Sequence, residues 1–205
     1  YLGHTYFYSS RFVEARDQYE RALVILTDLE NPRQMVELLT GVGGVNTSMG
    51  RMEDANDAYR RGIELAVQNG LGDHELVCRR DLADNYRIQG RYEDALDELE
   101  TSLHLLESNP NPTEQMRVYR TRGSTYMGMG ERGQARDDLL KSVELARQMD
   151  NPAYVAGVLT DIGYLYRDLG AFDRGLAAAD EARQLAEKAG DGRLYRDAVE
   201  LQGEI

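Results

Sequence analysis

The sequence predicts an all-α protein built from repeated pairs of helices. Its clearest sign is a phrase that occurs twice: GRMEDA begins at Gly50 and GRYEDA begins at Gly90. Related segments in the same register begin at Ser10, Gly130 and Gly170, so the spacing is 40 residues each time. A fixed period of roughly 20 to 50 residues is the sequence signature of a repeat architecture.

Each repeat is predicted to contain two helices, because apolar and small residues recur at helical spacing. In one first helix these residues are Leu159, Ile162, Gly163, Tyr166 and Leu169. In one second helix they are Tyr92, Ala95, Leu96, Leu99, Leu103 and Leu106. The pattern therefore indicates two amphipathic helices in every repeat.

Glycine, asparagine and proline divide the chain at regular places. A glycine such as Gly50 lies in the turn within a repeat, where a positive φ is needed. Asn31-Pro32 and Asn151-Pro152 end one helix and start the next. We therefore expect a single repeat domain that is part of a longer protein. Its repeats are 1–31 (partial), 32–71, 72–111, 112–151, 152–191 and 192–205 (partial).

Small residues near the middle of both helices predict a close contact within each pair. In the first helices they are Gly43, Ala83, Gly123 and Gly163, and in the second helices Ala55, Ala95, Ala135 and Gly175. Without large side chains at the contact, the two helices can approach closely. Gly41 and Gly44 also lie in the first helix of repeat 32–71, and each glycine is roughly 1 kcal/mol less favourable there than alanine.

At these positions the sequence resembles the tetratricopeptide repeat family. The family pattern places an apolar residue and a glycine three positions before a tyrosine, as in Ile162, Gly163 and Tyr166. The second helix of the pattern contains A-x3-F, and Ala95 and Leu99 occupy these positions. The match recurs in register over essentially the whole chain.

The sequence departs from the family pattern in three ways. It has no tryptophan, Asn46 replaces the expected tyrosine, and Arg122 replaces the expected leucine. Its repeat also exceeds the family's usual length of about 34 residues. The surplus follows Ser102 and its equivalents, so it lengthens the second helix, the joint or the start of the next helix.

The resemblance implies a right-handed α-α superhelix, a solenoid whose first helices line a concave groove for peptides. It assigns Thr40, Gly44 and Thr47 to groove-facing positions in repeat 32–71. The candidate partner-binding residues at equivalent positions are Arg80, Asp84, Arg87, Arg117, Arg120, Ser124, Met127, Tyr164 and Arg167.

Arginines are in local excess in the segment 116–128, which contains no acid although the chain has 36 acidic residues. Arginine can grip a carboxylate by paired hydrogen bonds. For Arg117 and Arg120 we therefore favour an anion-binding role toward an acidic partner. Acids from a neighbouring repeat would reverse this interpretation.

Arg80 and Arg87 could extend the same anion-binding patch. In the alternative interpretation, Arg80, Asp84 and Arg87 neutralise each other along one helix face, because residues three and four apart are neighbours on a helix. We favour this alternative slightly for Arg80 and Arg87.

Composition excludes several other classes of function. A net charge of −12 makes the chain repel nucleic acid and anionic lipid, and no run of 18 apolar residues exists to span a membrane. Cys78 is the one cysteine, so no internal disulfide can form, and we expect a reducing, cytoplasmic location. His74 and Cys78 share a helix face, but two ligands do not make a zinc site, so no metal or cofactor is expected.

No arrangement of catalytic residues stands out, so we do not expect an enzyme. The sequence predicts a protein-interaction scaffold whose partner is a protein or peptide with acidic groups. Self-association through uncapped ends is a further expectation. The alternative is a sensor or regulatory repeat arm of a multidomain signalling ATPase or transcription regulator.

Overall fold

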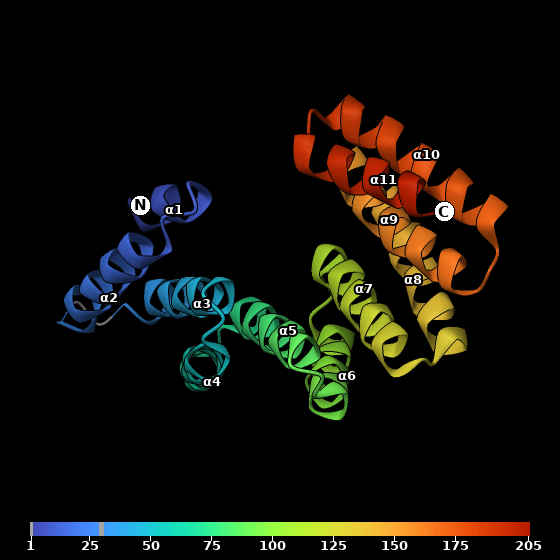
Figure 1. Ribbon diagram of the computed structural model, residues 1–205. Coiled ribbons are helices and arrows are strands. Elements are labelled where there is room, and N and C mark those ends of the chain that lie inside the picture. The colour runs from blue at the N-terminus through green and yellow to red at the C-terminus, as the bar shows by residue number, and fades with distance from the viewer. Residues whose placement is uncertain (1, 29–30) are drawn as a thin grey trace. The chain divides into compact units, whose positions relative to one another are not determined.

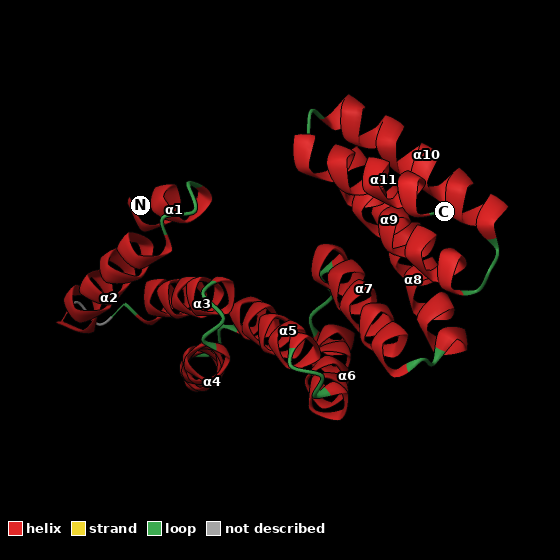
Figure 2. Ribbon diagram, viewed as in Figure 1, coloured by secondary structure: helices red, strands yellow, loops and turns green. Residues whose placement is uncertain are grey.

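The computed structural model describes residues 2–28 and 31–205, and every regular element within them is an α-helix (Figure 1, Figure 2). The helices are α1 (Leu2–Tyr8), α2 (Phe12–Asp28), α3 (Pro32–Ser48), α4 (Met52–Gln68), α5 (Gly72–Ile88), α6 (Tyr92–Ser108), α7 (Pro112–Met129), α8 (Arg132–Gln148), α9 (Pro152–Asp168), α10 (Phe172–Ala189) and α11 (Gly192–Glu204). This confirms the predicted all-α fold of repeated helix pairs. None of the helices in these ranges has the length and apolar character that a bilayer crossing requires.

The helices form two compact units, residues 1–109 and 110–205, here called the N-terminal and C-terminal units. Within each unit, consecutive helices pack side by side and run antiparallel (Figure 1). The first helices of successive repeats also touch, α3 against α5 in one unit and α9 against α11 in the other. That the two units make a single repeat domain stays a prediction.

Helix starts follow the predicted asparagine and proline signals. Asn111 accepts a hydrogen bond from the backbone N–H of Glu114, and Asn151 accepts from Ala153 and Tyr154. Proline follows each of these caps at the first helical position, where its missing N–H costs nothing. The first helices of the repeats therefore begin at residues 32, 72, 112, 152 and 192.

The repeat length is set by helices of nearly constant size. α3, α4, α5 and α6 each have 17 residues, and the connections 49–51, 69–71 and 89–91 separate them. α6 continues to Ser108, well past Ser102, so the surplus over the usual repeat is helical and not in the joint. Gly50 and Gly90 have φ of 73° and 74°, which confirms the predicted turn glycines.

The predicted close contact within helix pairs is present in the C-terminal unit. A Cβ atom added to Gly163 would lie 3.4 Å from the carbonyl oxygen of Gly175, and one on Gly123 would lie 3.2 Å from that of Ala135. The same small residues also make room for a side chain: a Cβ on Gly123 would lie 2.8 Å from Cγ of Leu139, and in the N-terminal unit Gly43 accommodates Tyr59, two repeats before Leu139. A Cβ on Gly43 would lie 2.4 Å from Cε1 of Tyr59, which is 4% exposed.

Two glycines of α3 should therefore respond oppositely to alanine. Gly43→Ala forces the buried Tyr59 ring to move, and overpacking of this kind costs about 1–3 kcal/mol. Gly44→Ala is the matched control, because its new Cβ meets only the Tyr59 hydroxyl, at 4.0 Å. We expect urea unfolding followed by circular dichroism to show lower stability for Gly43→Ala. Gly44→Ala should gain up to about 1 kcal/mol from helix propensity. Equal effects of the two changes would contradict the close contact at Gly43.

Candidate functional site

The C-terminal unit has a pocket of about 220 Å³ lined by residues of first helices alone. We call it the Arg117 pocket, and its lining residues are Met116, Arg117, Arg120, Ala153, Tyr154, Asp191, Arg193 and Leu194. They come from α7, α9, and α11 with its N-cap. The structure therefore brings together two of the predicted anion-binding arginines and adds a third, Arg193.

The expectation that Arg117 and Arg120 lack acidic partners is wrong. Arg117 donates from Nη1 to Oε1 of Glu114 at 3.0 Å, one turn earlier on α7. Arg120 donates from Nε to Oδ2 of Asp161 on α9 at 2.5 Å. Glu114 precedes the acid-free segment, and Asp161 belongs to the next repeat, so neither is visible inside residues 116–128.

These ion pairs fix the arginines at the pocket without burying them. The side chains of Arg117 and Arg120 remain 37% and 38% exposed. The Arg117 guanidinium also lies 5.6 Å from the ring centroid of Tyr154 and donates to its hydroxyl at 3.4 Å. Because Asp161 belongs to the neighbouring repeat, the reason for favouring anion binding, arginines without acidic partners, no longer holds. Binding of a ligand carboxylate by the exposed part of these guanidinium groups stays a proposal.

Arg122, the third arginine of segment 116–128, forms a largely buried ion pair. It donates from Nε and Nη2 to the two carboxylate oxygens of Asp138 on α8, at 2.6 and 2.9 Å. Asp138 is 4% exposed, and its hydrogen bond raises the pKa of Arg122 above the usual value. This pair stands where another repeat has the apolar pair Ile162 and Ala178.

The predicted residues of α5 lie in the N-terminal unit and form local ion pairs. Arg87 is 2.8 Å from Asp84, and Arg80 is 2.8 Å from its chain neighbour Asp81. The Arg80 side chain is only 14% exposed. The geometry agrees with neutralisation along the helix face, except that Arg80 uses Asp81.

The remaining predicted site residues lie along the first helices of the C-terminal unit. Met127 packs against the hydrophobic core, and Ser124 is half-buried. Arg167 lies 4.9 Å from the ring centroid of Tyr164 and pairs with Asp168 and Glu204. Burial, and next the Glu204 carboxylate, raise the pKa of Tyr164. Their role in binding stays a prediction.

The N-terminal unit has a second pocket, of about 380 Å³, again lined by first helices alone. We call it the Glu37 pocket, and its lining residues are Glu37 and Thr40 of α3 with Asp73, His74 and Val77 of α5. His74 is 3.4 Å from Glu37, from Nε2 to Oε1. Of this set, only Thr40 is among the predicted groove-facing residues. Glu37 lies two repeats, or 80 residues, before Arg117, so the 40-residue period alone is a sequence signal that identifies Glu37 as a candidate.

The two pockets occupy equivalent positions in the repeat. Four residues of the Glu37 pocket lie 80 residues, or two repeats, before a lining residue of the Arg117 pocket. The pairs are Glu37 and Arg117, Thr40 and Arg120, Asp73 and Ala153, and His74 and Tyr154. The two pockets therefore share these positions, and Glu37 and Arg117 carry opposite charge at one of them. The Arg117 pocket has further lining from Asp191, Arg193 and Leu194, which the Glu37 pocket does not match.

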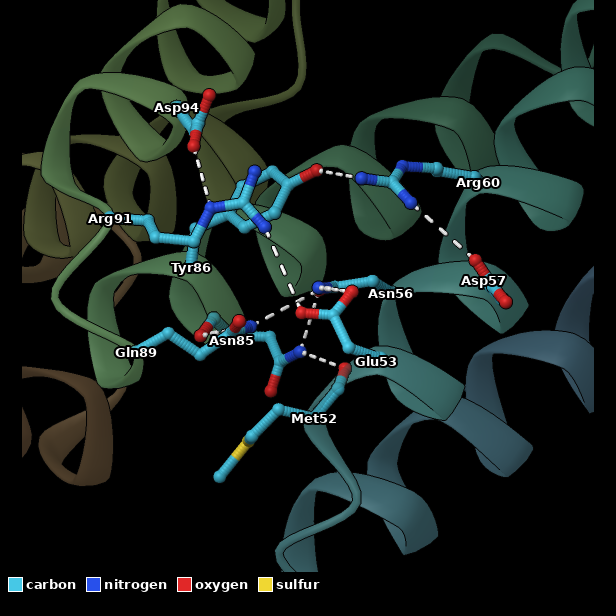
Figure 3. Close-up of polar contacts among 10 residues, drawn as sticks. All are labelled: Met52, Glu53, Asn56, Asp57, Arg60, Asn85, Tyr86, Gln89, Arg91 and Asp94. Carbon is cyan, nitrogen blue, oxygen red and sulfur yellow. Dashed lines mark hydrogen bonds and ion pairs between the residues drawn. The ribbon is translucent and has the colours of Figure 1, made fainter.

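A buried polar network joins three helices near the C-terminal ends of α3 and α5 (Figure 3). Asn85 of α5 donates from Nδ2 to Oδ1 of Asn56 at 2.7 Å and to the carbonyl oxygen of Met52 at 3.0 Å. The hydroxyl of Thr47 on α3 donates to Oδ1 of Asn85 at 3.1 Å. Since Asn56 and Asn85 are buried, these bonds fix α3, α4 and α5 against one another.

The network reaches Arg91 beside Tyr86 through Glu53, which accepts from Asn56 at 3.3 Å and lies 3.9 Å from Arg91. Arg60 donates to the Tyr86 hydroxyl at 2.7 Å, and the Arg91 guanidinium lies 4.3 Å from the ring centroid (Figure 3). Arg91 is in turn held by Asp94 at 2.7 Å. Tyr86 stands at the tyrosine position of the repeat pattern, which gives no sign of its arginine neighbours.

Cys78 lies directly behind the Glu37 pocket. It is fully buried, and its Sγ is 3.2 Å from Oγ1 of Thr40. Burial raises the pKa of the Cys78 thiol to about 11. Cys78 is thus a buried thiol, whereas His74 lines the pocket and pairs with Glu37. The described residues contain no group of three or more potential metal ligands.

The tetratricopeptide repeat family matches residues 34–108 and 117–149, together more than half of the chain. No curated protein matches the chain. Among solved structures, a thermophilic TPR protein of Thermus thermophilus is 24% identical, with a TM-score of 0.69 over 98% of this chain and 95% of that one. At this level of identity the likeness concerns the fold.

Two longer structures are also similar in fold. Aspartyl phosphate phosphatase F of Bacillus subtilis is 15% identical, with a TM-score of 0.85 over 98% of this chain and 53% of that one. A Rap protein complexed with competence and sporulation factor is 16% identical, with a TM-score of 0.82 over 98% and 62%. The chain therefore spans little more than half of these two relatives.

Removing Arg122 alone should destabilise the protein strongly. Arg122→Leu leaves the buried Asp138 carboxylate without its partner, and a broken buried pair costs about 3–5 kcal/mol. The double variant Arg122→Leu/Asp138→Ala restores an apolar pair like that of another repeat and should recover most of the loss. Urea unfolding of the three proteins tests this. If the double variant were no more stable than the single one, the pair would not be the cause.

Cys78 should react with a thiol reagent only after the N-terminal unit opens. At about pH 8 the native thiol is buried and protonated, so labelling should be slow and should accelerate at the urea concentration that unfolds the unit. Because its pKa is raised in the fold, stability should fall as pH rises from about 8.5 toward 11. Cys78→Ala should have a shallower pH dependence over that range. Fast labelling in native buffer would contradict the burial.

Proposed function

Because the chain belongs to the tetratricopeptide repeat family, we propose that it is a scaffold that binds a segment of a partner protein. Each unit has its own binding face on its first helices, α3 and α5 in the N-terminal unit and α7, α9 and α11 in the C-terminal unit. The observation that carries the proposal is the pocket that recurs on these helices at equivalent repeat positions. A surface that is already formed before binding lowers the entropic cost of holding a segment.

The Arg117 pocket provides the chemistry for an acidic side chain of the partner. Arg117 and Arg120 are oriented by Glu114 and Asp161, so their guanidinium groups need little reorganisation on binding. Hydrogen bonds that involve a charged group contribute about 1.5–3 kcal/mol each. Arg193 on α11 adds a third positive group to the lining.

The flanking residues extend this surface along the same helices. Ser124 and Met127 continue α7, and Tyr164 and Arg167 continue α9. We propose that they contact the partner segment on either side of the anchored carboxylate. Arg80, Asp84 and Arg87 offer a charge-balanced polar surface on α5. No chemical step is involved, since binding consists of presenting a preformed surface.

A second candidate is a repeat arm of a larger regulator. It is favoured by the fold likeness to Rap-type chains, of which this chain covers 53–62%. Two of those structures are described as complexes, one with competence and sporulation factor and one with the Phr* peptide. In this candidate the same face would bind a peptide effector, and the output would come from another part of the protein.

A selection of phage-displayed peptides on the full chain tests the scaffold. Selected peptides should bind Arg117→Gln/Arg120→Gln about tenfold to a hundredfold more weakly, because two charged hydrogen-bonding groups are removed. Arg136→Gln is the matched control, since Arg136 lies on the second helix α8 and pairs with its chain neighbour Asp137. Fluorescence anisotropy measures affinity, and circular dichroism checks folding.

The possible outcomes distinguish an error in the binding site from an error in the proposed function. Equal affinity for the pocket variant and the control would show that the arginines do not contact the ligand. Failure to select any peptide that binds the native chain would contradict a peptide-binding scaffold.

A further inference from the structure

We infer that the Glu37 pocket binds a basic side chain, lysine or arginine, of the partner segment. This inference rests on the proposed scaffold function and specifies the ligand of its N-terminal unit. It begins from the equivalence of the two pockets: the repeat places Glu37 where the other pocket has Arg117, and Thr40 where it has Arg120. Both pockets use the same repeat position here, and its side chain is acidic in one pocket and basic in the other.

The pocket has more space because the short Thr40 side chain stands where the Arg117 pocket has Arg120. The Arg120 guanidinium lies over Gly157, where an added Cβ would be 2.9 Å from Nη1. The hydroxyl of Thr40 instead turns to its own helix and to Cys78, at 2.9 Å from the carbonyl oxygen of Val36 and 3.2 Å from Sγ. The volume is about 380 Å³ in the Glu37 pocket and about 220 Å³ in the Arg117 pocket. That space is available for a long side chain from the ligand.

The lining matches the two parts of a basic side chain. Thr40 and Val77 offer methyl groups for an aliphatic stem, and Glu37 and Asp73 offer carboxylates for its cationic end. Glu37 is 48% exposed on its side chain and is oriented by His74 at 3.4 Å. A lysine or arginine that buries its stem and keeps its charge at a wet rim fits such a lining.

The two helices that line the pocket are joined near their C-terminal ends. The bonds among Thr47, Asn56 and Asn85 fix α3 and α5 against each other, and all the lining residues belong to these two helices. Cys78 beside Thr40 adds no charge at neutral pH, because burial raises its pKa to about 11. Glu37 contributes an exposed carboxylate to the lining.

The test uses N-acetyl-arginine amide as a probe of the full chain, followed by ¹H–¹⁵N NMR spectroscopy. Saturable shifts are expected at Glu37, Thr40, His74 and Val77. N-acetyl-citrulline amide, which is neutral and has the same shape, should bind at least about tenfold more weakly, as one charged hydrogen bond predicts. Glu37→Gln should weaken arginine binding by a similar factor.

Two controls isolate the pocket from the general negative charge of the chain. Glu64→Gln removes an exposed carboxylate from α4 and should leave arginine binding unchanged. Arg117→Gln/Arg120→Gln should also leave it unchanged, since those residues belong to the other pocket. Equal shifts with arginine and citrulline, equal loss in Glu37→Gln and Glu64→Gln, or shifts outside the pocket would each overturn the inference.

The selected peptides distinguish this inference from the proposed function. Replacing their basic residues by citrulline should weaken binding about tenfold to the native chain and little to Glu37→Gln. If peptides bind but citrulline replacement has no effect, the scaffold stands and the Glu37 pocket is not its cation site. If no peptide binds and the arginine probe gives no shifts, both are wrong.

Discussion

The close contact between paired helices at their small residues is the interaction on which the rest of the structure depends. Where Gly163 meets Gly175, an added Cβ on either residue would come within 3.4 Å of the other's carbonyl oxygen. The contact fixes how one helix lies on the next, and helices of nearly constant length then carry the same geometry along the chain. Side chains at four equivalent repeat positions on the first helices accordingly line a pocket in both units.

Repeat positions with the same backbone geometry differ in the charge of their side chains. Arg122 and Asp138 replace an apolar core pair by a buried ion pair, which changes the local packing without changing the helices. Arg117 and Glu37 occupy equivalent pocket positions with opposite charge. A repeat fold can vary its ligand in this way, because its pocket side chains change while its small contact residues stay small.

The sequence predicted the period, the helix pairs, the turn glycines and the caps, because each depends on residues close together in the chain. It also predicted arginines on the exposed face of α7. It did not predict their partners, since Asp161 lies 41 residues from Arg120 and reaches it only when α9 packs beside α7. The Glu37 pocket was not predicted for a different reason. The local excess of arginine marks only the repeat 112–151, whereas the 40-residue period applies equally to the equivalent positions of the other repeats.

The sequence by itself determined an all-α repeat of 40 residues with its helix boundaries and its closely packed positions, because propensity, capping and hydrophobic periodicity are local properties. Only the tertiary structure decided which charges are paired and which line a pocket. It also decided that Asn56 and Asn85 meet in the interior and that Gly43 makes room for Tyr59. These outcomes depend on distances between helices, which a pattern along one chain does not contain.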